Sequence, residues 1–141
     1  LGERDREATL RICPTSERPG HDPSRAFNIE FRAADATASP HLALAMLIRA
    51  GIEGVKAGLE TPPIVRGDPE EMSADERARL GIRRLPSSLP EALAALAADP
   101  VVCGWLTPTF LDCWKGMRLK ELEIVAGLDD AALCQRYARV Y

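Results

Sequence analysis

Two short segments near the start of the chain alternate between polar and apolar residues. Residues 7 to 13 and 27 to 34 both show this period of two, which is typical of strands, and Pro and Gly residues punctuate the loop between them. Successive side chains of a strand point to opposite faces, so parity sorts them. One face of the pair collects the polar residues, namely Glu7, Thr9, Arg11 and Cys13 on the first strand and Asn28, Glu30, Arg32 and Ala34 on the second. The pattern predicts two paired strands with one apolar and one charged face.

The segment that follows the two predicted strands has the pattern of a helix. A Ser-Pro pair at residues 39 and 40 begins an Ala- and Leu-rich segment that we expect to be helical to about Leu59, because Ser can cap a helix and Pro suits its first turn. The charged residues of this helix form one narrow stripe, made of Arg49, Glu53 and Lys56. Because the rest of its surface is apolar, we expect the helix to be buried apart from that stripe.

Four more helices are expected further along the chain. Capping boxes at residues 73 to 76 and 88 to 91 predict a short helix and a second, Ala-rich one, and further helices are expected over residues 107 to 126 and 129 to 139. Residues 60 to 87, which are rich in Pro and charge, should form an exposed, mobile connection around the short helix. The predicted fold class is α+β, with antiparallel strands followed by a set of packed helices.

Composition narrows the class of protein. With 141 residues and 46% hydrophobic residues, the chain can form a single domain with a core. A net charge of -3 and a pI near 5.4 argue against nucleic acid as a partner, since phosphate binding needs clustered Lys and Arg. The longest apolar run, residues 42 to 48, is far shorter than the roughly 20 residues that span a bilayer. We therefore expect no membrane partner and a cytoplasmic protein.

The cysteines and the start of the chain lead to two further expectations. Cys13, Cys103, Cys113 and Cys134 are widely spaced, with no CxxC pair, so we expect buried, reduced thiols rather than a zinc site. The chain enters a strand pattern almost at its first residue and has no starting Met. It is therefore expected to be the C-terminal piece of a longer protein.

The charged strand face holds the side chains that could carry chemistry. Glu30 could bind a divalent cation, while the forked donors of Arg11 and Arg32 suit carboxylate or phosphate oxygens, with Arg6 and Arg25 close in sequence. The same pattern also fits an exposed ladder of cross-strand ion pairs, which is common and contributes little stability. Spacing alone leaves both interpretations open.

Three stretches add a resemblance to a known family. The segments "REATLRI", "NIEFRAADATASPHLALAMLIRAGIEGVK" and "LPSSLPEALAALAADP" resemble the C-terminal part of the catalytic domain of the glutamine synthetase family, nearest to its glutamine-synthetase-like and γ-glutamyl-amine ligase branch. The central pattern is Glu-x-Arg, then Asp, then a Pro-led Ala/Leu helix with late glycines. Weaker similarity at "KELE" and "RYARVY" extends the match over nearly all of residues 1–141. The resemblance implies that the strands form part of a glutamine-synthetase-type catalytic sheet.

The resemblance also implies an activity and a set of site residues. Members phosphorylate the side chain of glutamate with ATP and let ammonia or an amine displace the phosphate, with Mg²⁺ or Mn²⁺ as the metal. By motif, Glu30 corresponds to a metal ligand and Arg32 to the arginine that grips the substrate. Arg6 and Arg11 correspond to arginines near the ATP phosphates, so that Arg6 and Arg32 would be the catalytic pair. Arg25 corresponds, more weakly, to a basic nucleotide contact.

Two departures from the family pattern qualify this interpretation. Asn28 stands where many members carry Arg. The resemblance therefore gives less support to a phosphate contact at this position and to a reaction restricted to glutamate and ammonia. The family's other metal carboxylates and its substrate loop belong to upstream sequence. We therefore expect the chain alone to be inactive and to need the rest of its parent chain, within a homo-oligomer. The alternative is a non-catalytic relative that keeps the fold as a scaffold or binding module.

Overall fold

The computed structural model describes residues 1–15 and 18–140. Residues 16 and 17 of the expected inter-strand loop, and residue 141 of the terminal "RYARVY" segment, lie outside the described part. The chain divides into two compact units, Leu1–Arg83 and Arg84–Tyr141. The first contains the strands and the second contains helices.

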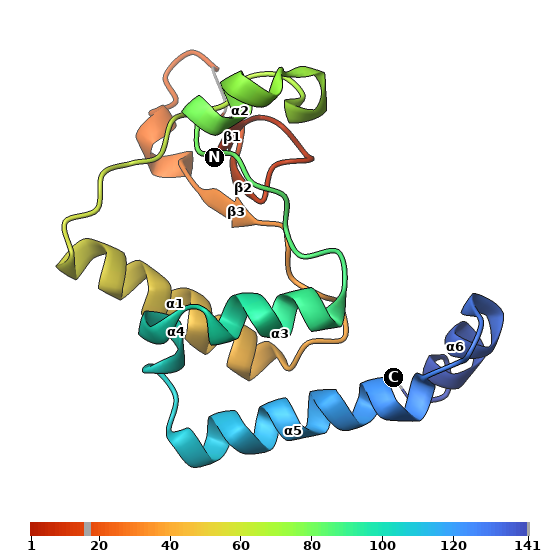
Figure 1. Ribbon diagram of the computed structural model, residues 1–141. Coiled ribbons are helices and arrows are strands. Elements are labelled where there is room, and N and C mark those ends of the chain that lie inside the picture. The colour runs from red at the N-terminus through yellow and green to blue at the C-terminus, as the bar shows by residue number, and fades with distance from the viewer. Residues whose placement is uncertain (16–17, 141) are drawn as a thin grey trace. The chain divides into compact units, whose positions relative to one another are not determined.

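A small mixed sheet forms the centre of the first unit. Its three strands, β1 (Gly2–Glu3), β2 (Leu10–Ile12) and β3 (Ile29–Phe31), lie side by side in the order β1-β2-β3 (Figure 1). β2 and β3 are antiparallel, as expected from the sequence, although both are shorter than the alternating segments. β1 pairs with β2 in parallel and was not expected. The fold is therefore α+β, with one more strand than the pattern indicated.

The outer edge of β1 meets a residue from the connection after the long helix. Val65 forms a parallel bridge with Gly2, and its side chain is only 9% exposed. The expectation that residues 60 to 87 lie wholly at the surface was thus wrong at Val65. Its backbone completes hydrogen bonds that the two-residue strand would otherwise leave open.

The first unit contains η1 (Pro23–Ala26), α1 (Pro40–Lys56), η2 (Pro69–Glu71) and α2 (Ala74–Arg79). α1 and α2 begin where the sequence predicted, whereas the short 3-10 helices η1 and η2 were not predicted. Ser73 Oγ accepts from the Glu76 N–H at 3.2 Å, as the capping box predicted. At α1, Ser39 precedes Pro40 but makes no side-chain cap hydrogen bond, so the Pro rather than a Ser cap marks this start.

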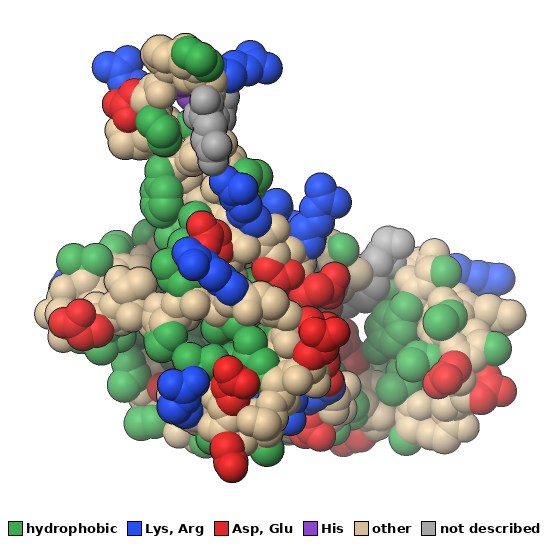
Figure 2. Space-filling view, turned by 90° about the horizontal axis from the view of Figure 1, so that it is seen from above, with side chains coloured by type: hydrophobic (Ala, Val, Ile, Leu, Met, Phe, Trp, Pro, Cys, Tyr) green, Lys and Arg blue, Asp and Glu red, His purple; other side chains and the backbone are tan. Residues whose placement is uncertain are grey.

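The surface of α1 differs from the prediction. No residue of α1 is buried, and an apolar stripe runs along it at helical spacing, made of Leu44, Ile48, Ile52 and Val55. Hydrophobic side chains accordingly lie open on the molecular surface in Figure 2. The predicted charged stripe is present, since Arg49 and Lys56 both pair with Glu53. Among the described elements, α1 packs extensively against no other helix or strand, which accounts for the exposed stripe.

The second unit contains α3 (Leu89–Ala97), α4 (Pro100–Cys103), α5 (Pro108–Val125) and α6 (Asp130–Tyr137). α3 packs against α4 and α5. Each helix begins at a residue whose side-chain oxygen accepts a hydrogen bond from a backbone N–H of the first turn, namely Ser88, Asp99, Thr107 and Asp129 in turn. Three of the four match the predicted segments within about two residues, and the short α4 was not predicted.

The exposure of the cysteines differs from the prediction. All four cysteines are free thiols, but Cys113 and Cys134 are exposed and the other two are half-buried, so the prediction of buried thiols was wrong. Cys113 lies on α5 and Cys134 on α6. In the described part of the chain, none of the helices has the length and apolar character needed to cross a membrane.

Candidate functional site

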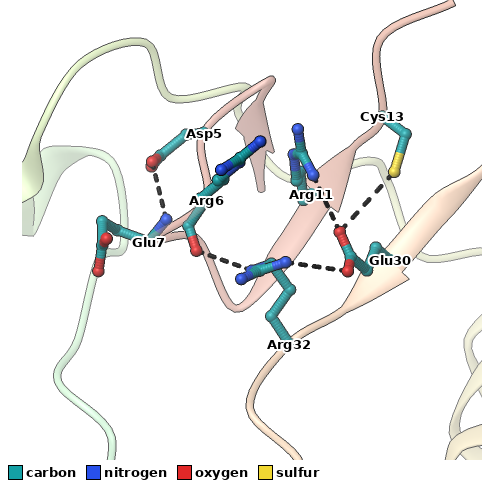
Figure 3. A network of polar contacts seen from close by, with 7 residues as sticks. All are labelled: Asp5, Arg6, Glu7, Arg11, Cys13, Glu30 and Arg32. Atoms are coloured by element: carbon teal, nitrogen blue, oxygen red, sulfur yellow. Dashed lines mark hydrogen bonds and ion pairs between the residues drawn. The ribbon is translucent and has the colours of Figure 1, made fainter.

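Glu30 lies between two arginines on the polar face of the sheet. Arg11 Nη1 donates to Glu30 Oε2 at 3.1 Å, and Arg32 Nη1 donates to Glu30 Oε1 at 2.9 Å. Figure 3 shows the two guanidinium groups approaching the carboxylate from different segments, Arg11 from β2 and Arg32 from the chain just after β3. Each carboxylate oxygen therefore has its own charged donor.

Strand register explains why these three side chains meet. Arg11 of β2 stands directly opposite Glu30 of β3 in the antiparallel pair. Directly opposite side chains share a face, and so do residues two apart on one strand, which brings Arg32 to the same side. The parity argument from the sequence therefore placed Arg11, Glu30 and Arg32 correctly.

The two arginines set the ionisation of the carboxylate. The hydrogen bond from Arg11, followed by the one from Arg32, holds the pKa of Glu30 below its ordinary value. Glu30 is therefore ionised at neutral pH. An ionised carboxylate is the form that binds a metal ion or forms an ion pair.

Arg11 is the least exposed member of the group. Its side chain is 14% exposed, against 41% for Glu30. Arg11 Nε is buried and, among the described residues, has no hydrogen-bond partner. Cys13, on the same strand face, places Sγ 3.9 Å from Glu30 Oε2, a weak thiol contact. The site thus holds one donor without an acceptor beside an ionised carboxylate.

Arg6 takes part in a way that sequence reasoning missed. Its backbone carbonyl accepts a hydrogen bond from Arg32 Nε at 2.7 Å, as Figure 3 shows. The expected role of Arg6 belonged to its guanidinium, whereas the observed contact is made by its main chain. A backbone acceptor leaves no signal in residue type, so only the fold could show it.

Arg25 and Asn28 make their polar contacts away from this group. Arg25 lies on η1, is 85% exposed and has Asp22 as its ion-pair partner at 3.9 Å. Asn28 donates its side-chain amide to the Ala26 carbonyl at 3.0 Å. The structure therefore brings Arg11, Glu30, Arg32 and the Arg6 backbone together, but not Arg25.

The described residues do not make a metal site by themselves. Residues 1–15 and 18–140 contain no group of three or more His, Cys, Asp or Glu side chains placed to hold a metal ion. Glu30 is a suitable single ligand by charge and oxygen chemistry, but divalent cations need several oxygen ligands. Any further ligands would have to come from outside the described residues.

Comparison with known proteins connects this geometry to a family. The model of the glutamine synthetase catalytic domain matches residues 1–133. The γ-glutamylpolyamine synthetase GlnA3 of Streptomyces coelicolor is 38% identical over 140 residues, which cover 99% of this chain and 29% of that protein. The glutamine synthetase of Thermococcus kodakarensis is 41% identical over 101 residues, covering 72% of this chain and 21% of that protein.

A solved structure agrees with the sequence comparisons. The crystal structure of a novel glutamine synthase homolog superposes with a TM-score of 0.78 at 38% identity, covering 99% of this chain and 29% of that one. The chain thus spans less than a third of the length of these relatives. The family match extends over the strands, the site and most of the helices. The chain belongs to the glutamine synthetase family and corresponds to part of its catalytic domain.

Proposed function

We propose that this chain is the C-terminal part of the catalytic domain of an ATP-dependent glutamate–amine ligase. In that reaction the terminal phosphoryl group of ATP passes to the side-chain carboxylate of glutamate, giving γ-glutamyl phosphate. The nitrogen of ammonia or an amine then attacks the acyl carbon, phosphate leaves, and a γ-glutamyl amide forms. The proposed protein is cytoplasmic, which suits its free thiols, and homo-oligomeric.

The observation that carries this proposal is the ionised Glu30 held between Arg11 and Arg32 at 3.1 and 2.9 Å. The reaction collects anionic oxygens from glutamate and from ATP. Arginines bind such oxygens through forked hydrogen bonds and stabilise charge that develops during phosphoryl transfer. In this assignment Arg32 binds the acidic substrate, and Arg6 and Arg11 face the ATP phosphates.

Arg11 offers a specific reason to expect an anionic ligand. Its Nε is a buried donor without an acceptor among the described residues, which costs roughly 1–3 kcal/mol in a folded protein. A phosphate oxygen could supply that acceptor once the guanidinium turns toward the ligand. Arg25, which is exposed on η1, is proposed as a peripheral nucleotide contact only.

Glu30 is proposed as one ligand of Mg²⁺ or Mn²⁺ in the complete domain. A bound divalent cation would neutralise phosphate charge. The part of this chain needed for that role is an ionised carboxylate, and Arg11 and Arg32 keep Glu30 in that state. The remaining ligands are assigned to the parent chain, because the described residues offer no complete set.

Amines as well as ammonia are candidates for the acceptor of the γ-glutamyl group. GlnA3, named as a γ-glutamylpolyamine synthetase, matches 99% of this chain, while the Thermococcus kodakarensis glutamine synthetase matches 72%. Asn28 adds no cation to the polar strand face, and its amide is bonded to the Ala26 carbonyl. A neutral residue there suits a cationic acceptor better than an arginine would, since like charges repel.

The deciding experiment is Glu30→Gln in the full-length protein that contains this chain. The substitution keeps the size and removes the charge, so ATP turnover with glutamate and an amine should fall by roughly 100-fold or more at saturating Mg²⁺. Glu53→Gln is the matched control, because Glu53 also pairs with two cations but lies on α1. Its turnover should equal that of the unmodified protein.

The same measurement separates the enzyme from a scaffold. Ammonia, a monoamine and a polyamine should each be offered as acceptor to the unmodified full-length protein, with release of phosphate as the readout. Turnover that vanishes in Glu30→Gln and survives in Glu53→Gln supports the ligase. No turnover with any acceptor would favour the non-catalytic scaffold, and equal turnover in all three proteins would remove Glu30 from the site.

A further inference from the structure

The segment after α1 forms hydrogen bonds with the outer edge of β1. Val65 N donates to the Leu1 carbonyl at 2.8 Å, and Glu3 N donates to the Val65 carbonyl at 3.4 Å. Beside this bridge, Arg66 Nε donates to Glu3 Oε2 at 2.7 Å. We call these contacts of Val65 and Arg66 with Leu1 and Glu3 the β1 anchor.

The position of β1 controls the loop at residues 4–9. Parallel strands usually need a connection of a dozen or more residues, so this short loop between β1 and β2 is tightly constrained. It begins at Arg4, whose φ of 60° is in the left-handed region. It also passes so close to Gly2 that an added Cβ would lie 2.5 Å from Ala8 Cβ. A shift of β1 would therefore displace the loop.

That loop accepts two hydrogen bonds from Arg32. The Arg6 carbonyl accepts from Arg32 Nε at 2.7 Å, and the Thr9 carbonyl accepts from the Arg32 backbone N–H at 2.9 Å. The other guanidinium contact is to Glu30 on β3. Because a hydrogen bond weakens steeply beyond about 3.2 Å, a loop movement of about 1 Å would release Arg32 Nε.

We infer that Arg66 is a positioning residue, which orients the Arg32 guanidinium through the β1 anchor and the loop at residues 4–9. Arg66 is exposed and pairs with Glu3, whereas Arg11 and Arg32 pair with Glu30. Its effect on substrate passes through Glu3, β1 and the Arg6 carbonyl. The inference rests on the proposed function where it predicts kinetics, and on geometry alone where it predicts loop motion.

The test compares Arg66→Ala, Arg66→Lys and the control Arg79→Ala in the full-length protein. Arg79 is also exposed and paired, with Glu76, but lies on α2. Arg66→Ala should raise the KM for the acidic substrate about two- to fivefold, as expected for losing an exposed ion pair, with kcat and the KM for ATP little changed. Arg66→Lys should bring the KM for the acidic substrate much of the way back to that of the unmodified protein, and Arg79→Ala should leave it unchanged.

A second readout does not depend on activity. Amide hydrogen exchange at residues 4–9 and at the Arg32 N–H should be faster in Arg66→Ala than in Arg79→Ala. Gly2→Ala should accelerate the same amides more strongly, because its Cβ would collide with Ala8. If the full-length protein proves to have no ligase activity, the proposed function fails and exchange still decides this inference.

Two results would overturn the positioning role. Exchange at residues 4–9 that is the same in Arg66→Ala and Arg79→Ala would show that the anchor does not restrain the loop. Equal increases in the KM for the acid and for ATP, together with a fall in kcat, would show a general loss of structure rather than an effect on Arg32.

Discussion

Arg32 has two acceptors for its guanidinium, and they belong to different elements. Nε donates to the Arg6 carbonyl at 2.7 Å and Nη1 donates to Glu30 at 2.9 Å. This fixes the plane of the guanidinium, so its three remaining N–H groups, on Nη1 and Nη2, point in defined directions. A planar fork of this kind matches a carboxylate, whereas the ammonium of Lys is a point charge.

Arg32→Lys should therefore affect the acidic substrate selectively. Loss of a charge-assisted, two-point contact should raise the KM for glutamate about tenfold or more in the full-length protein, with a smaller change in the KM for ATP. Steady-state kinetics with each substrate varied in turn would check this. A change of similar size for both substrates would instead indicate that the Arg32–Glu30 pair is structural.

Some of this residue-level geometry could be predicted from sequence, and some could not. Alternation placed Arg11 and Glu30 on one face because side chains of a strand repeat every two residues, and register then set them opposite each other. The contact at the Arg6 carbonyl depends on the loop at residues 4–9. Main-chain groups are the same in every residue, so no pattern of side chains could indicate that contact.

At the scale of elements, helix starts were well predicted because their signals are local. Ser88 Oγ accepts from Glu91 N–H at 3.4 Å, while Glu91 Oε2 accepts from Ser87 N–H at 2.8 Å. The return bond therefore comes from the residue before the cap rather than from the cap itself. β1 was missed for the opposite reason, since two residues carry no period and their partners at residues 11, 12 and 65 lie elsewhere in the sequence.

The N-terminal cap of α3 should make the thermal stability of the protein vary with pH in the acidic range. Hydrogen bonds from the Ser87 backbone N–H and then its hydroxyl lower the pKa of Glu91, so folding favours its ionised form. A depressed folded-state pKa means that the stabilisation is present above the unfolded value, about 4.3, and is lost as pH falls through the folded value. Glu91→Gln should lower Tm at pH 7 and make little difference well below pH 4.

Thermal unfolding of the full-length protein between pH 3 and 7 would measure this, with Glu60→Gln as the control on an exposed, non-helical residue. The Tm difference between Glu91→Gln and the unmodified protein should narrow as pH falls. A difference that stays constant over this range would mean that packing of the side chain, rather than its charge, matters at the cap.

At the scale of the whole molecule, exposed apolar surface is the main feature. Val55 is 84% exposed on α1, and Phe27 and Ile29 are each more than half exposed at or beside β3. β3 is also the outer strand of the sheet on the side away from β1. Apolar patches and open strand edges of this kind are typical of surfaces that bind other protein. The chain spans 29% of GlnA3, so the proposed parent contains ample sequence to cover them.

The 141-residue chain on its own should therefore self-associate and should bind ATP weakly or not at all. Apolar stripes favour association because burying them removes apolar area from water. Arg32 is 33% exposed and already pairs with Glu30, so solvent and that ion pair both weaken its attraction for phosphate. Light scattering should show assemblies that shrink in Ile48→Lys, which places a charge in the stripe of α1, but persist in Val101→Lys, which changes an exposed residue of α4. Calorimetry with Mg²⁺ should show no micromolar ATP affinity. A monomer that binds ATP at micromolar concentration would show that the nucleotide site is complete within this chain and that no upstream sequence is needed to build it.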